Sequence, residues 1–289
     1  MTNAIYEQTL HKILRWRDDP REVWGQATGL APLDLLTGGL HDEDYTVLAG
    51  RPSMGKSALA MQIGFHRARE YQRLGEDRRV IIFSAEMTGW QVVLREAARL
   101  ARIPSTTIKR GELSDAELAY VQGVIQDMRT YPLHLDDTHA ITGELVYERL
   151  RRLKDSGPRI GLVIFDHLHL GGGDREYERI GALSATLQRA SKKLQVPVLA
   201  LAQLNRKVED RGVPIPVLSD LRGTGSIEQD VDNAWFIYRA RKYDLTLDQN
   251  EAHEAHILVE KARNHGELGT AVVEFVPRFT DFRNPPEEP

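Results

Sequence analysis

A glycine-rich run near the start of the chain has the residue types and spacing to bind phosphate groups. It matches the pattern G-x-x-x-x-G-K-[ST] and consists of Gly50, Arg51, Pro52, Ser53, Met54, Gly55, Lys56 and Ser57. Glycines let the backbone turn its N–H groups toward phosphate oxygens, and a following helix N-terminus adds partial positive charge. Lys56 can then reach the β- and γ-phosphates, and the Ser57 hydroxyl can ligate Mg²⁺. An incidental glycine-rich turn is the alternative, but the run stands between a predicted strand and a predicted helix, which favours nucleotide binding.

Polar side chains at the ends of three apolar runs could complete such a site. Asp166 follows the run 162–165, and a carboxylate at the carboxyl end of a buried strand can hold Mg²⁺ or its water. Glu86 follows 81–85 and could polarise the attacking water, although the residues alone leave an ordinary surface glutamate equally open. Gln203 ends a further run, where an amide could sense the γ-phosphate or simply cap a loop.

The elements that would position these residues alternate along the chain. Apolar runs predict strands at 45–49, 80–84, 133–136, 162–165, 198–201 and 234–238, with a closing pair at 255–261 and 270–276. Amphipathic or capped segments predict helices at 56–73, 90–102, 114–129, 144–154 and 178–195. Residues 203–225 are rich in glycine, proline and charge, which predicts a loop. This alternation predicts an α/β fold with a mainly parallel sheet flanked by helices on both faces.

The N-terminal segment is predicted to be separate from this domain. Residues 5–17 form an amphipathic helix pattern, and a polar linker follows. We therefore divide the chain into a linker helix and linker at 1–24, one domain at 25–283 and a disordered tail at 284–289. The apolar stripe of the helix must be buried somewhere, and the sequence leaves its own domain and a neighbouring subunit equally open.

Composition narrows the class of protein. The chain has no cysteine, which excludes disulfides, thiol catalysis and cysteine-type zinc sites. No apolar run reaches the roughly 18 residues of a membrane span, so we expect a cytoplasmic protein without a membrane partner. The net charge of −4 at pH 7 argues against a surface that coats nucleic acid, so any such contact must be local, as in a loop or a pore lining.

These segments together resemble the ATPase domain of the DnaB family of bacterial and phage replicative helicases, which has a RecA-like P-loop fold. The matching runs are 49–57, 83–87, 162–166, 200–206, 219–230 and 261–264. They occur in the family order and the resemblance covers about residues 25–283. The run Arg-Pro-Ser-Met-Gly-Lys and the run Gly-Ser-Ile-Glu-Gln-Asp are far more specific than the phosphate loop alone.

The resemblance implies catalytic roles. Glu86 corresponds to the catalytic glutamate of the family, and Gln203 to its γ-phosphate sensor. Arg263 and Lys261 correspond to an arginine finger and its companion, which reach the nucleotide of the next subunit. Asp166 and Ser57 would hold Mg²⁺, with Asp166 acting directly or through water. ATP and Mg²⁺ are the implied cofactors.

The resemblance also implies partners. Arg222, Gly223 and Gly225 fall on the loop that contacts the phosphates of single-stranded DNA inside a hexameric ring. One arginine and exposed glycine N–H groups can follow a backbone without reading bases. A homo-hexamer that hydrolyses ATP and translocates 5′ to 3′ is therefore expected, with a primase or a helicase loader as further partners.

Some residues depart from the family pattern. His167 and His169 replace the usual Tyr and Gln, Gly223 stands where an acidic residue is common, and Ala262 where Gln is frequent. The chain also starts at the linker helix, without the helical N-terminal domain that the family usually carries. His167 and His169 share one face of a strand and, with Asp166, could suggest a metal cluster. Neither His134 nor His139 can be placed beside them as a further ligand, which favours ordinary loop histidines.

Two other functions stay open. The first is a RecA-like ATPase that does not unwind DNA, although one such type carries a cysteine-based zinc module that is missing here. The second is a domain-deleted helicase paralogue that modulates a helicase ring. The complete set of ATPase residues favours an active ATP hydrolase and DNA helicase.

Overall fold

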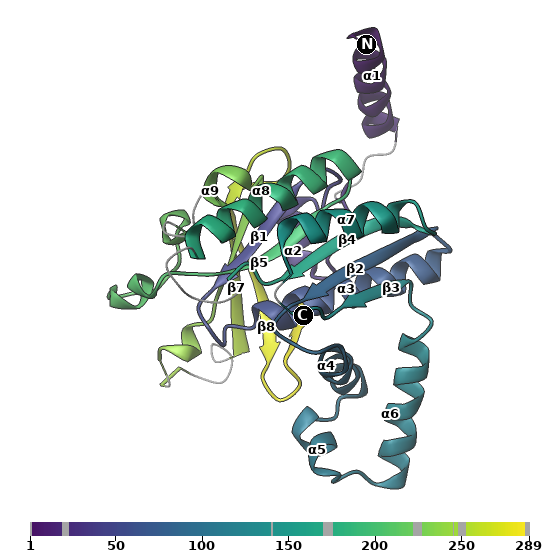
Figure 1. Cartoon of the computed structure of the whole chain (residues 1–289). Coiled ribbons are helices and arrows are strands. Elements are labelled where there is room, and N and C mark those ends of the chain that lie inside the picture. Colours follow the sequence, from purple (N-terminus) through teal and green to yellow (C-terminus); the bar gives the residue numbers. More distant parts are fainter. Residues whose placement is uncertain are drawn as a thin grey trace.

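The computed structural model describes residues 2–18, 23–139, 141–169, 176–221, 227–244, 246–247 and 253–286. Within them, nine strands form one sheet in the order β3-β2-β4-β5-β1-β6-β7-β8-β9 (Figure 1). The strands are β1 Tyr45–Gly50, β2 Arg78–Ser84, β3 Leu133–Asp136, β4 Arg159–Asp166, β5 Val198–Gln203, β6 Asn233–Tyr238, β7 Glu254–Ala262, β8 Gly269–Val276 and β9 Asp281–Arg283. In this order the strands from β3 to β6 pair in parallel, and β7, β8 and β9 add antiparallel pairs. The predicted mainly parallel α/β fold is confirmed.

Two hydrophobic cores lie on opposite faces of the sheet, because successive strand residues point to opposite sides. In β1, Val47 belongs to one core and Leu48 to the other, and in β6 Phe236 and Trp235 divide in the same way. Helices on the Leu48 face are α2 Ala31–Thr37, α3 Lys56–Leu74 and α4 Gly89–Ala101. Helices on the Val47 face are α7 Gly143–Lys154, α8 Glu176–Leu194 and α9 Ile227–Asp230. The central strands are thus buried on both faces, which explains their almost continuous apolar sequences.

A helical extension projects from the sheet between β2 and β3 (Figure 1). It contains the outer part of α4, then α5 Ser105–Arg110 and α6 Asp115–Met128, around a small core that includes Ile103 and Val121. The capping box predicted at the start of α6 is present: the Ser114 hydroxyl accepts from Glu117 N at 3.3 Å, and Ser114 N donates to the Glu117 carboxylate at 2.8 Å.

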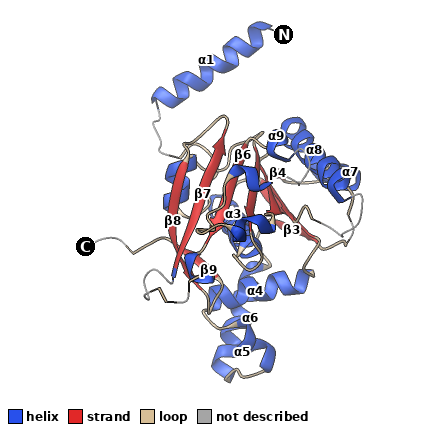
Figure 2. Cartoon of the chain, turned by 90° about the vertical axis from the view of Figure 1, so that its left-hand side faces the viewer, coloured by secondary structure: helices blue, strands red, loops and turns tan. Residues whose placement is uncertain are grey.

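Helix α1, Thr2–Asp18, stands apart from the sheet and its helices in both views (Figures 1 and 2). Its described apolar side chains Tyr6, Leu10, Ile13 and Leu14 are exposed. The apolar stripe is therefore not covered by its own domain. Among the described helices, none combines the length and apolarity needed to cross a bilayer.

Several short elements were missed by the sequence patterns. These are α2, α5, α9, β9, the 3₁₀ helix η3 Ala240–Lys242 and, inside the predicted loop 203–225, the 3₁₀ helices η1 Arg206–Asp210 and η2 Leu218–Leu221. Each is too short to show a hydrophobic period, and tertiary contacts hold it in place. At the far end, Asn284, the first residue of the predicted tail, accepts a hydrogen bond from Ala31 N at 2.6 Å.

Candidate nucleotide-binding site

Strand register brings the predicted site residues to one edge of the sheet. Gly50 at the end of β1 pairs with Gln203 at the end of β5, and Ser84 at the end of β2 pairs with Asp166 at the end of β4. Because these strands are parallel, their carboxyl ends meet at the same edge, where open α/β sheets bind ligands. Residues from distant parts of the sequence thus surround the predicted phosphate loop.

The loop between β1 and α3 needs glycine for its shape. Gly55 has φ 107°, and a Cβ added there would lie 2.8 Å from Cζ of Phe282 in β9. Ser53 also has a positive φ, 64°. This tight turn ends at the N-terminus of α3, whose first N–H groups have no partner inside the helix and can bind an anion.

Lys56 is held within the loop. Its ammonium donates to the carbonyl oxygens of Gly50 at 2.9 Å and Arg51 at 3.2 Å. Burial lowers the pKa of Lys56 to about 8, while the carboxylates of Asp166 and Glu86 act in the opposite direction. Lys56 therefore lies in the electrostatic field of both predicted acids.

Arg51 fastens the phosphate loop to the segment after β5. Its buried guanidinium donates to the Glu209 carboxylate at 2.9 Å and to the Leu204 carbonyl at 2.9 Å. The loop and the segment that follows Gln203 are thus connected by direct bonds. A movement of the segment after β5 would therefore displace Arg51 and the phosphate loop.

Asp166 fits a role as a cation ligand. It is 1% exposed, and within the described residues neither of its carboxylate oxygens makes a hydrogen bond of normal geometry. Burial raises the pKa of Asp166 to about 6, and the nearby Ser57 hydroxyl opposes that rise. A buried carboxylate without a partner is costly, and a bound cation would remove that cost. The hydroxyl of Ser57 and the carboxylate of Asp166 are oxygen donors of the kind that Mg²⁺ takes.

Glu86 and Gln203 approach the same edge from β2 and β5, the strands on either side of β4. The Glu86 side chain is 60% exposed, and its Oε2 lies 3.5 Å from Nδ1 of His167. Gln203 N donates to Nδ1 of His169 at 3.2 Å. Burial lowers the pKa of His169 to about 4, which keeps that ring neutral and able to accept. Burial also lowers the pKa of His167.

Arg263 and Lys261 lie at the opposite edge of the sheet, where the parallel strands begin. Arg263 N donates to the Asp232 carbonyl at 3.0 Å, and Asp232 N donates to the carbonyl of Tyr45, where β1 begins. The Lys261 ammonium donates to the Glu228 carbonyl at 2.7 Å. A strand rises about 3.3 Å per residue, so the length of β1 separates these cations from the phosphate loop by roughly 15 Å or more. The fold does not bring them to the nucleotide edge of their own subunit.

The predicted DNA-binding residues Arg222, Gly223 and Gly225 lie outside the described residues. The segments on either side are anchored, since Leu221 and Ile227 are both buried. The assignment of this loop to DNA stays a prediction.

Arg239 is a residue beside the phosphate loop that the sequence patterns missed. It follows β6, its guanidinium lies 3.7 Å from the Phe275 ring centroid, and it donates to the Ser53 carbonyl at 3.5 Å. Burial lowers the pKa of Arg239 to about 10. A charged residue directly after an apolar strand is the signal that identified Asp166, and it could have identified Arg239 too.

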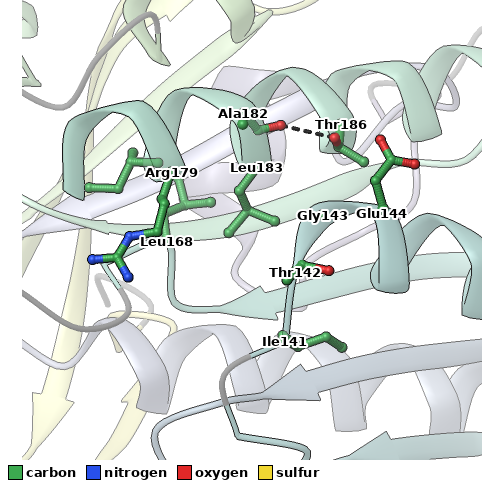
Figure 3. A pocket seen from close by; sticks show the side chains of 10 residues that line it. Ile141, Thr142, Gly143, Glu144, Leu168, Arg179, Ala182, Leu183 and Thr186 are labelled. Atoms are coloured by element: carbon green, nitrogen blue, oxygen red, sulfur yellow. Dashed lines mark hydrogen bonds between the residues drawn. The ribbon is translucent and has the colours of Figure 1, made fainter. Parts of the chain in front are cut away.

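A separate cavity of about 340 Å³ lies between α7 and α8 (Figure 3). Leu168 and Leu183 give it an apolar wall, and the Thr186 hydroxyl beside it donates to the Ala182 carbonyl at 2.9 Å. None of the described residues that line it was predicted as a site residue. Leu168 turns into this cavity, whereas its sequence neighbours His167 and His169 contact the nucleotide edge.

Comparisons with known proteins agree with this geometry. Residues 25–284 match the family described as the DnaB-like helicase C terminal domain. The chain is 36% identical over 286 residues to the replicative DNA helicase DnaB of Buchnera aphidicola from Schizaphis graminum, covering 97% of this chain and 60% of that protein. It is 35% identical to the replicative DNA helicase DnaB of Haemophilus influenzae, covering 98% of this chain and 61% of that protein. The chain therefore spans about three fifths of the length of these relatives.

Solved structures show the same fold. One of them, an isolated ATPase domain, superimposes with a TM-score of 0.87 at 26% identity, covering 97% of this chain and 98% of that one. A DnaB-like replicative helicase, solved to show its interactions with primase, has a TM-score of 0.85 at 26% identity, covering 96% of this chain and 66% of that one. With the phosphate loop, the strand-end acids and the family match in agreement, this chain belongs to the DnaB-like helicase C-terminal domain family.

Proposed function

We propose that this chain hydrolyses ATP at the interfaces of a homo-hexameric ring and uses that energy to translocate on single-stranded DNA. One observation carries the proposal: the phosphate loop, Glu86, Asp166 and Gln203 meet at one edge of the sheet, while Arg263 stands at the other edge. A site divided in this way is completed by a second copy of the chain. Family membership supports the same activity.

Each residue at the nucleotide edge has a role in this proposal. The loop N–H groups and Lys56 hold the phosphates, and Ser57 and Asp166 hold Mg²⁺, which supplies positive charge to the transferring phosphoryl group. Glu86 accepts a proton from the attacking water, and its exposed carboxylate is accessible for that step. Gln203 senses the γ-phosphate, and the Arg51–Glu209 pair connects the loop to the segment beyond Gln203.

The partners of the ring are also part of the proposal. The loop that contains Arg222 would contact the phosphates of single-stranded DNA, with the 5′-to-3′ direction taken from the family. The exposed stripe of α1 would pack on a neighbouring subunit. Contact with a primase rests on the solved DnaB-like helicase, and contact with a helicase loader rests on family resemblance alone.

Two assays test the proposal. Lys56→Ala should abolish ATP hydrolysis, and Glu86→Gln should slow it by about 10²–10⁴-fold while ATP binding persists. Strand displacement on forked DNA then tests unwinding by the wild-type chain. Hydrolysis without displacement would identify an ATPase that does not unwind DNA by itself, and hydrolysis by Glu86→Gln at the wild-type rate would remove Glu86 from the base role.

A further inference from the structure

Beyond the phosphate loop, one group of side chains has the composition of a transition-metal site. Within the described residues, Glu86, Asp166 and His167 offer ligand atoms that all lie within 4.8 Å of one another. Ligands at about 2.0–2.2 Å from a common ion are about 3–4 Å apart, so small side-chain movements suffice to enclose one. The sequence could place neither His134 nor His139 beside Asp166, His167 and His169. The fold instead brings Glu86, which follows the adjacent strand β2, to Asp166 and His167.

The buried ligand atoms of Asp166 and His167 are poorly paired among the described residues, although the Ser57 hydroxyl lies near Asp166. Asp166 is 1% exposed, and neither its carboxylate oxygens nor Nδ1 of His167 makes a hydrogen bond of normal geometry within the described residues. The 3.5 Å between His167 Nδ1 and Glu86 Oε2 exceeds the length of a good N–H···O bond. Buried polar atoms are normally paired, and a cation bound between these groups would pair both of them. The Lys56 ammonium is directed to the carbonyls of Gly50 and Arg51 instead.

The backbone holds the cluster in place. Asp166 is the last residue of β4, and its carbonyl accepts from Ala85 N at 2.7 Å, which fixes the chain just before Glu86. Leu168 points into the cavity between α7 and α8 (Figure 3). The preceding residue, His167, lies on the nucleotide side, where its Nδ1 is 3.5 Å from Glu86 Oε2. A site built on strand ends is pre-organised to a degree that surface side chains are not.

We propose that Glu86, Asp166 and His167 bind a divalent first-row transition-metal ion. Two carboxylates supply the charge to balance a divalent cation, and an imidazole nitrogen favours transition metals over Mg²⁺, which prefers oxygen ligands. This ligand set differs from the Ser57–Asp166 set proposed for Mg²⁺. An ion bound here would occupy the Glu86 carboxylate and so stop Glu86 from acting as a base. This consequence, unlike the metal site itself, rests on the proposed function.

Mn²⁺ is the probe that tests the site, because its paramagnetism reports both binding and ligand nitrogen. Mn²⁺ is titrated into the nucleotide-free chain after chelator treatment. The decrease of the electron paramagnetic resonance signal of free Mn²⁺ gives the affinity. Electron spin echo modulation then detects nitrogen bonded to the bound ion. The wild-type chain should bind Mn²⁺ with one imidazole nitrogen, and excess Mg²⁺ should not remove that nitrogen signal.

The variants separate the ligand from its neighbour. His167→Gln should lose the nitrogen modulation and weaken Mn²⁺ binding by roughly tenfold or more. The matched control His169→Gln, two residues along the same strand end, should keep both. Unchanged melting temperatures establish that each variant is folded. If His167→Gln is not folded, His167→Asn replaces it in the same measurements.

Two results would overturn the proposal: a wild-type chain that binds no Mn²⁺ without nucleotide, or nitrogen modulation that survives in the His167 variant. Neither depends on ATP hydrolysis. If the wild-type chain binds Mn²⁺ through nitrogen but hydrolyses no ATP, the proposed function fails and the metal site stands.

Discussion

The Arg263 guanidinium donates to the Asp232 carboxylate of its own chain at 3.3 Å, and 48% of the Arg263 side chain stays exposed. Asp232 itself is buried and also accepts from the Lys192 ammonium at 3.0 Å and from Tyr45 N at 3.0 Å. Arg263 could therefore turn toward a neighbouring subunit without leaving a buried carboxylate unpaired. The Arg263 side of this pair is half exposed and Asp232 keeps two other donors, so releasing the arginine costs about 1 kcal/mol or less.

Arg263→Ala should lower ATP turnover by about 10³–10⁵-fold if the arginine neutralises charge on a neighbour's γ-phosphoryl group. Arg263→Ala and Lys56→Ala chains should each be inactive alone, and mixing them should restore part of the activity, because some interfaces then combine an intact loop with an intact arginine. Lys192→Ala is the control, since it contacts the same Asp232 and should keep turnover. Near-normal turnover of Arg263→Ala alone would end the shared-site proposal.

Arg222→Ala should weaken single-stranded DNA binding for all sequences alike. Removing one phosphate contact should reduce the slope of log affinity against log salt by about 0.7. Fluorescence anisotropy with several oligonucleotides over a salt series measures both quantities. Arg152→Ala, on the outer surface of α7, is the control and should change neither. An unaltered slope for Arg222→Ala would exclude the loop assignment.

Leu10→Asp in α1 should weaken assembly while nucleotide binding persists. Leu10 is 51% exposed in the single chain, and burying such a side chain in an interface is worth about 1.5–3 kcal/mol. Sedimentation with and without ATP measures the oligomer, with the exposed Glu7→Gln as the control. Deleting residues 1–19 should have a larger effect in the same direction. An unchanged oligomer for the deletion would exclude a role of α1 in assembly.

Gly55→Ala should abolish ATP binding and lower the free energy of unfolding. The new Cβ would meet Phe282 at 2.8 Å while φ stays at 107°, and strain of this kind costs about 1–3 kcal/mol. Gly75→Ala is the matched control, since φ is 65° there but nothing lies within 4 Å of an added Cβ. The control should retain ATP binding and lose less stability. Denaturant titration and nucleotide-binding assays decide between these outcomes, and a Gly55→Ala chain that binds ATP normally contradicts the loop geometry.

His41 should make the fold sensitive to mild acid. Its ring stacks on His265 at 3.7 Å, and burial, with His265 adding to it, lowers the pKa of His41 from 6.5 to about 4. Between these values the unfolded chain binds more protons, so stability is full above pH 6.5 and is lost as the pH falls toward 4. The pKa shift of His41 corresponds to about 1 kcal/mol of unfolding free energy after allowance for the partial exposure of the ring.

Urea denaturation at about pH 7.5 and about pH 5 measures this loss. Between about pH 7.5 and about pH 5, the free energy of unfolding of His41→Gln should fall by about 1 kcal/mol less than that of the wild-type chain. The variant His134→Gln, at an exposed histidine, should behave as wild type. Partly buried His66 and His169, whose pKa values are also lowered, leave a residual dependence in every variant. Equal losses for His41→Gln and wild type would contradict the assignment.

Features that depend on short runs of residues could be predicted from the chain alone. The phosphate loop, the acid that ends β4, the capping box of α6 and the strand and helix alternation are local patterns, because helix and strand periods are properties of neighbouring residues. Family resemblance added the predicted roles of Glu86 and Arg263, which spacing alone left open.

Which of these residues meet depends on tertiary contacts. The register that pairs Ser84 with Asp166 brings Glu86 to His167, and the antiparallel turn into β7 carries Arg263 to the far edge of the sheet. Short elements such as β9 form only because β8 and α3 offer partners for them. These contacts join residues far apart in the chain, and no local pattern encodes them, since the free energy that selects them comes from burial and pairing in the assembled fold.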